Sequence, residues 1–193
     1  MSTEVLTRER AREGEKKPPF LRLVLVLFLI TAISALLLAA VNEVTKDRIA
    51  ALEAQKLQEA MEAVQPQADS FEKRDVTADL VTGFYAAKSG DKDVGYCVLT
   101  APNGFGGAMS VLVGVDLEGN VTGVQIISHS ETAGLGTKAM EPGFLGQFKD
   151  RGGEFTVNGG DNSIDGVSGA TISSKAITAG VNAALAAIEE VLP

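Results

Sequence analysis

The sequence predicts an α+β fold, a mostly antiparallel sheet with flanking helices, preceded by one N-terminal transmembrane helix. Three observations predict it. An uncharged apolar stretch near the N-terminus is long enough to cross a bilayer. Two pairs of alternating segments then flank short turns, as hairpins do. The chain ends in a segment with apolar residues at helical spacing. Hairpins and helices that are separated along a chain favour an antiparallel sheet covered by helices.

The predicted transmembrane helix is residues 21–42. Leu23 to Val41 contains no charged side chain, and at about 1.5 Å per residue it extends roughly 28 Å. A cleaved signal peptide is the alternative, but its apolar region is usually only about 7–15 residues long. No A-x-A-like cleavage site follows, so we expect the segment to be retained.

The charges that flank this segment predict its orientation. Six basic residues precede or begin it: Arg8, Arg10, Arg12, Lys16, Lys17 and Arg22. Only Lys46, Arg48 and Lys56 follow within the next 15 residues. By the positive-inside rule, residues 1–20 are a cytoplasmic tail and residues 67–193 an extracytoplasmic domain. The protein would therefore be a single-pass protein of the cell (inner) membrane.

Residues 43–66 are predicted to be a juxtamembrane helix that Pro66 stops. Its apolar residues recur at helical spacing: Val44, Ile49, Leu52, Leu57, Met61 and Val64. A solvated stalk and a packing face for partner subunits both remain open.

Two hairpins follow. Val81–Ala87 and Asp93–Thr100 flank a turn at Lys88–Asp91. Ala108–Val115 and Val121–Ser128 flank a second turn, at 116–120. Because the second pair is rich in Val and Ile, we expect it at the centre of the sheet.

The last part of the chain alternates between short elements and a long helix. We expect a short helix at Glu141–Lys149, with Pro142 near its start, and a short strand at Phe155–Val157. A loop rich in Gly and Asn follows, and a helix is predicted over Ser168–Leu192. The apolar side of that helix would carry Ile172, Ala176, Val181, Leu185, Ile188 and Leu192.

The composition excludes several classes of function. The net charge of −8 argues against nucleic acid as a partner. With Cys97 as the single cysteine, an intramolecular disulfide is impossible, and so is an iron–sulfur cluster held by about four thiolates. His129 is the single histidine, so a His-rich zinc or copper site is excluded. Redox chemistry would need an organic cofactor.

The first candidate site is the Gly-rich segment from Asp165 to Thr171, which runs directly into the last predicted helix. The free N–H groups and the dipole at a helix start attract phosphate. Gly169 and Ala170 leave room for a ligand, and Thr171 places a hydroxyl beside it. A helix cap made by Ser168 or Thr171 is the alternative.

The second candidate site is His129–Lys138, directly after a predicted strand. Gly134 and Gly136 bracket Leu135, so the backbone can approach a flat ligand. The hydroxyls of this segment can donate to ring carbonyls or phosphate, and Lys138 can offset phosphate charge. An ordinary loop after a strand is the alternative.

Together the two segments resemble a known family. The string H-x-E-T-x-G-L-G, followed by D-x-x-S-G-A-T behind one membrane helix, is similar to the FMN-binding G subunit of the Rnf electron transport complex. The related C subunit of the sodium-pumping NADH:quinone reductase shares both motifs. The turn at residues 104–107, Gly-Phe-Gly-Gly, resembles the family's G-Y-G-G, and Ala133 stands where the family usually has Pro.

The resemblance implies a cofactor and a site. A flavin transferase would move FMN from FAD onto Thr171, forming a phosphodiester bond. The residues that would contact the cofactor are Ser168, Gly169, Ala170, Glu131, Thr132, Gly134, Leu135, Gly136, Thr137 and Lys138. The chain would relay electrons between ferredoxin and NAD, and the complex would couple this transfer to ion transport. Its partners would be the other membrane subunits of an Rnf-type complex. A membrane-tethered assembly or sensory module without a redox cofactor is the main alternative. An enzyme with a Thr171 or Ser168 nucleophile ranks last, since no base accompanies either residue.

Overall fold

The computed structural model describes residues 20–191, which divide into two units between Ala51 and Leu52. One continuous helix, α2 (Phe20–Val64), runs through both. In residues 20–51 the apolar side chains of α2 are exposed, and the most apolar window has a mean hydropathy of 2.9. Within the described part of the chain, α2 is the one helix long and apolar enough to cross a membrane. Thr31, a polar residue of this stretch, donates its hydroxyl proton to the Leu27 carbonyl at 3.0 Å.

The second unit is built on an antiparallel five-stranded sheet in the order β1-β2-β3-β4-β5. Its strands are β1 (Ser70–Arg74), β2 (Val81–Ser89), β3 (Lys92–Thr100), β4 (Ser110–Asp116) and β5 (Val121–Ser128). Both predicted hairpins and the fold class are confirmed. Strand β1, which was not predicted from the sequence, carries three charges in five residues and no clear alternation. It is a strand because it pairs antiparallel with β2. Glu72 also forms an ion pair with Lys88 of β2, whose hydrogen bond lowers the pKa of the Glu72 carboxyl.

Two details of the hairpins differ from the prediction. The first turn is only Gly90-Asp91, because Lys88 and Ser89 extend β2 and pair with β3. The second hairpin is not the centre of the sheet. Strand β3 is central, and β5 lies at an edge. In β5, Val121 and Val124 are buried, and Ile126 and Ile127 pack partly buried against the two cores. Composition alone cannot distinguish such an edge strand from a central one.

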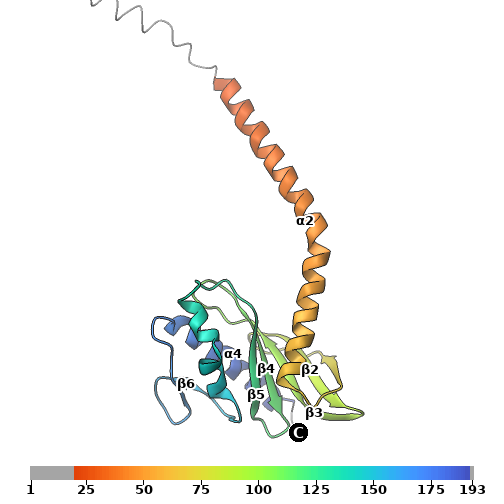
Figure 1. Cartoon of the computed structure of the whole chain (residues 1–193), viewed down its shortest axis with the longest axis vertical. Coiled ribbons are helices and arrows are strands. Elements are labelled where there is room, and N and C mark those ends of the chain that lie inside the picture. Colours follow the sequence, from red (N-terminus) through yellow and green to blue (C-terminus); the bar gives the residue numbers. More distant parts are fainter. Residues whose placement is uncertain (1–19, 192–193) are drawn as a thin grey trace, which may run out of the picture. The chain divides into compact units, whose positions relative to one another are not determined.

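A helix lies against each face of the sheet (Figure 1). One face packs against α4 (Thr171–Glu189) through alternate residues of β2, β3 and β4, and this is the larger core. Its strand residues include Phe84, Ala86, Tyr96, Val98, Val111, Val113 and Val115. The opposite face receives the last turns of α2, in a smaller cluster around Met61, Val64, Cys97 and Leu112. The alternation of side chains along a strand is what divides the two cores.

The end of α2 docks closely because the sheet offers glycines beneath it. A Cβ atom on Gly114 would lie 2.7 Å from the Val64 Cβ atom. The Gln65 side-chain amide donates to the Val115 carbonyl at 2.8 Å. Of the apolar positions predicted for the juxtamembrane helix, Leu57, Met61 and Val64 therefore pack on this chain's own sheet, whereas Val44, Ile49 and Leu52 are exposed.

Short elements connect β5 to α4. They are η1 (Gly136–Met140), α3 (Pro142–Leu145), η2 (Gly146–Phe148), β6 (Thr156–Val157) and β7 (Ser163–Ile164). The predicted helix at 141–149 is present with Pro142 at its start, but it becomes a 3₁₀ turn at Gly146. Strand β7, inside a predicted loop, was missed.

The final helix begins at Thr171 and not at Ser168, because Gly169 has a φ of +81° that no α-helical residue adopts. The prediction that Ile172 lies on the apolar side of this helix is wrong, since Ile172 is 54% exposed. Leu192 lies outside the described residues.

Candidate functional site

The candidate site is a cavity of about 280 Å³ between three segments that are far apart in the sequence. The turn before β4 contributes Phe105. The loop after β5 contributes Glu131, Thr132, Leu135 and Gly136. The start of α4 contributes residues 169–173. The two motifs predicted from the sequence thus form opposite walls of one cavity.

The wall from α4 is a helix start without a cap. Ala170 is the N-cap residue, and no side chain caps the helix. Ser174 is the first residue whose N–H bonds back, to the Ala170 carbonyl at 2.8 Å, so the three N–H groups before it lack helical partners. The first turn has no acidic residue, and Thr171 is exposed at its first position. The alternative in which Ser168 or Thr171 caps this helix is therefore wrong.

Hydrogen bonds hold the loop that leads into α4. The side-chain amide of Gln147 accepts from the Asp165 N–H at 2.8 Å and donates to the Asp165 carbonyl at 3.1 Å. The Ser174 hydroxyl accepts from the Val167 N–H at 3.1 Å. Gly169 then turns the chain with its positive φ, and a Cβ atom there would lie 3.3 Å from Leu135. The approach to Thr171 is consequently a fixed loop that needs glycine.

Glu131 organises the opposite wall. Its side chain is 8% exposed, and its Oε1 atom accepts from the backbone N–H groups of Phe105 at 2.8 Å and Gly106 at 3.3 Å. Cβ atoms on Gly104 and Gly136 would collide with its carboxylate. The glycines of two segments thus make the slot in which this carboxylate lies.

Exposed apolar side chains gather at this cavity. Among the described residues after Leu52, four large apolar side chains are exposed: Phe105, Leu117, Leu135 and Ile172. All but Leu117 line the cavity. Exposed apolar groups that converge on one cavity are typical of a binding site for a flat, largely apolar ligand.

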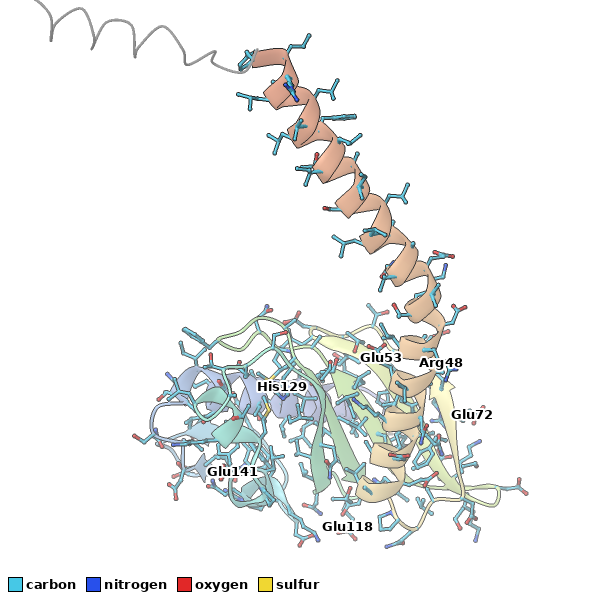
Figure 2. The ribbon with its side chains drawn as sticks, turned by 45° about the horizontal axis from the view of Figure 1, so that its top comes forward. Arg48, Glu53, Glu72, Glu118, His129 and Glu141 are labelled. Carbon is cyan, nitrogen blue, oxygen red and sulfur yellow. The ribbon has the colours of Figure 1, made fainter. Side chains whose placement is uncertain are left out.

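Four of the predicted contact residues do not line the cavity: Ser168, Gly134, Thr137 and Lys138. The Thr137 hydroxyl instead accepts from the Gly134 N–H at 2.9 Å and closes the loop. His129 stays in its own loop, where its Nδ1 atom accepts from the Glu131 N–H at 3.3 Å. Figure 2 shows His129 and Glu118 at opposite ends of the β4–β5 hairpin, with the site at the His129 end.

Three lining residues were absent from the predicted set of contacts: Phe105, Ile172 and Ser173. The sequence signal that could have predicted Phe105 as a lining residue is its position as an aromatic residue between glycines. Ile172 and Ser173 follow Thr171 in the first turn of α4, and only the correct start of the helix shows which way each one faces.

Comparison with known proteins identifies the class. Residues 104–186, which include every lining residue of the cavity, match the family model of the FMN-binding domain. Residues 16–64 match the model of the RnfG N-terminal region. The second unit therefore contains an FMN-binding domain.

Similar proteins define the family. The chain is 38% identical to the G subunit of the proton-translocating ferredoxin:NAD(+) oxidoreductase complex of Clostridium ljungdahlii, over 79% of this chain and 83% of that protein. It is 35% identical to the G subunit of the Na(+)-translocating complex of Acetobacterium woodii, over 83% and 87%. The crystal structure of Shewanella oneidensis NqrC aligns with 20% identity and a TM-score of 0.43. The alignment covers 61% of this chain and 65% of the NqrC chain. The chain belongs to the RnfG family.

Proposed function

We propose that this protein is an electron relay of a membrane-bound, ion-translocating ferredoxin:NAD oxidoreductase complex, and that it carries FMN on Thr171 through a phosphodiester bond. One observation carries the proposal: Thr171 is the first residue of an uncapped helix and lines a cavity with exposed apolar walls. The start of α4 suits the phosphate of FMN, and the apolar walls suit its ring. These two groups are the two ends of one ligand.

The residues of the site fit the two halves of FMN. The free N–H groups and positive dipole at the start of α4 suit a phosphate, and no carboxylate in that turn opposes it. Phe105, Leu135 and Ile172 offer apolar surface to an isoalloxazine ring. The cavity of about 280 Å³ lies just below the usual range of about 300–1,000 Å³ for ligand pockets, so it would take the ring and leave the rest of the cofactor along its rim.

Attachment would be a phosphoryl-group transfer performed by a flavin transferase. The Thr171 oxygen would form a bond to the FMN phosphorus of FAD as the pyrophosphate bond breaks, AMP leaves and the hydroxyl proton is released. Thr171 is exposed, so a second enzyme can reach it. A covalent bond suits a domain outside the cytoplasm, where a lost flavin would not be replaced.

The flavin supplies one- and two-electron chemistry, and this chain supplies binding, orientation and electrostatics. The start of α4 would hold the phosphate, and the apolar walls would exclude water from the ring. No base or nucleophile is required for electron relay. The C. ljungdahlii and A. woodii relatives belong to proton- and Na(+)-translocating complexes respectively, which makes further subunits of such a complex the expected partners.

We also propose the topology that the charges predict. Residues 1–20 would be cytoplasmic, 21–42 would span the membrane, 43–66 would form the juxtamembrane part of α2, and 67–193 would be the extracytoplasmic FMN-binding domain. The exposed apolar face of α2 before Ala51 supports a membrane anchor. Residues 43–193 retain 11 of the 17 basic and 21 of the 25 acidic residues, a net charge of −10 that disfavours docking onto anionic lipid.

Intact-protein mass spectrometry tests the attachment. Full-length protein produced together with a flavin transferase should gain the mass of one FMN, and peptide mapping should place it on Thr171. The variant Thr171→Ala should stay unmodified. Thr132→Ala, which removes another hydroxyl of the same cavity, is the matched control and should be modified. Covalent flavin retained in Thr171→Ala would refute the assignment. A colourless, unmodified protein from its native host would favour the assembly or sensory alternative.

A further inference from the structure

One atom of the site has no partner. The Oε2 atom of Glu131 is buried, and within the described residues no hydrogen bond reaches it. Its Oε1 atom is occupied by the N–H groups of Phe105 and Gly106. A buried carboxylate oxygen without a donor is costly, and such groups usually have a functional explanation.

The position of this carboxylate relates it to the cavity. Glu131 lines the cavity, and its Oε2 atom lies beside Gly136, another lining residue, where a Cβ atom would be only 2.2 Å away. The Oε2 atom is shielded from solvent beside Gly136, so a shift of that backbone would open it to a ligand while Oε1 stays bonded to Phe105 and Gly106. Among the cavity residues whose side chains are described, Glu131 is the one that carries a formal charge.

A flavin ring offers the complementary group. The oxidised isoalloxazine has a single N–H donor, the imide N3–H, at the end of the ring that gains negative charge on reduction. A carboxylate is an acceptor only, and a hydrogen bond to a charged acceptor is stronger than one between neutral groups.

We propose that the free oxygen of Glu131 accepts a hydrogen bond from the flavin imide N–H, so that Glu131 both orients the ring and lowers its reduction potential. This inference rests on the proposed function. It adds a second role to the same side chain: one oxygen holds the turn that carries Phe105, while the other binds the ring. A fixed negative charge next to the imide disfavours the extra negative charge that reduction places there.

The first test is the midpoint potential of covalently loaded, full-length protein. Glu131→Gln keeps a carbonyl oxygen for Phe105 and Gly106 but removes the charge, so its flavin potential should shift upward from the wild-type value. Glu118→Gln removes one negative charge from the far end of the hairpin (Figure 2) and should leave the potential unchanged. A loaded Glu131→Gln protein with the wild-type potential and absorption spectrum would overturn the proposal.

The second test needs no covalent attachment. Full-length protein made without a flavin transferase is titrated with riboflavin and with N3-methylriboflavin, which lacks the imide donor. In the wild type, methylation should weaken binding by roughly 10- to 100-fold, the usual effect of losing one hydrogen bond to a charged group. In Glu131→Gln the loss should be much smaller.

The outcomes separate this inference from the proposed function. Equal losses in both proteins would mean that Glu131 only supports the turn, and the inference would fail. No riboflavin binding by the wild type would also overturn it. A wild-type protein that binds riboflavin with the predicted discrimination, yet is never modified at Thr171, would leave the inference standing and refute the covalent attachment.

Discussion

The hydroxyl of Thr122 in β5 donates a hydrogen bond of 2.6 Å to the carbonyl of Val64, the last residue of α2. The bond joins residues 58 positions apart in the sequence and satisfies one of the free carbonyls at the helix end. The Val64 side chain fills the space above Gly114 and Gly123. Within the second unit, the last turn of α2 is thus fixed to the sheet that carries the site.

We expect Gly114→Ala to destabilise the second unit. The added Cβ atom would lie 2.5 Å from the Thr122 hydroxyl oxygen and 2.7 Å from the Val64 Cβ atom, so the end of α2 would have to move. Overpacking of this kind costs about 1–3 kcal/mol of unfolding free energy. Chemical denaturation of the full-length protein in detergent measures it. Gly143→Ala is the matched control, because nothing lies within 4 Å of its Cβ position. Equal stability of the two variants would contradict this docking of α2 on the sheet.

We expect Phe105→Ala to expose the bound flavin without destabilising the protein. The Phe105 side chain is 67% exposed, and truncation of an exposed side chain changes stability by no more than about 0.5 kcal/mol. Loss of one apolar wall should increase quenching of flavin fluorescence by iodide in the loaded protein. Leu117→Ala removes a 48% exposed side chain outside the cavity and should leave quenching as in the wild type. If iodide quenches the flavin fluorescence of both variants to the same extent, Phe105 does not cover the ring.

The single cysteine predicts a pH dependence. Burial raises the pKa of the Cys97 thiol from its ordinary value of 9.0 to about 12. Between these values the unfolded chain releases a proton that the folded protein retains, so this group's contribution to stability falls as pH rises, by at most about 1.4 kcal/mol per pH unit. Unfolding free energies of wild type and Cys97→Ala should therefore converge between pH 9 and pH 11. Parallel curves would contradict the raised pKa.

The regular elements of the fold follow from local patterns in the sequence. The uncharged run from Leu23 to Val41 is helical because of its composition, and the β2–β3 and β4–β5 pairs follow from alternation and turn residues. Strand β1 was not predicted from the sequence because pairing with β2, rather than its own residue pattern, makes it a strand. The start of α4 was misplaced by three residues because Gly169 adopts a positive φ, and residue type alone does not show which conformation a glycine takes.

The sequence by itself determined the two motifs, which depend only on residue types and spacing, and its single cysteine excluded a multi-cysteine metal centre. The choice of Thr171 as acceptor stays a prediction, made from the resemblance of these motifs to the family. The tertiary structure decided what meets at the site. In the folded protein Phe105, from a distant turn, lines the cavity. The Thr137 hydroxyl bonds within its own loop, and one oxygen of Glu131 has no hydrogen-bond partner among the described residues. Contacts between segments far apart in the chain are set by strand register and core packing, and no local pattern encodes those.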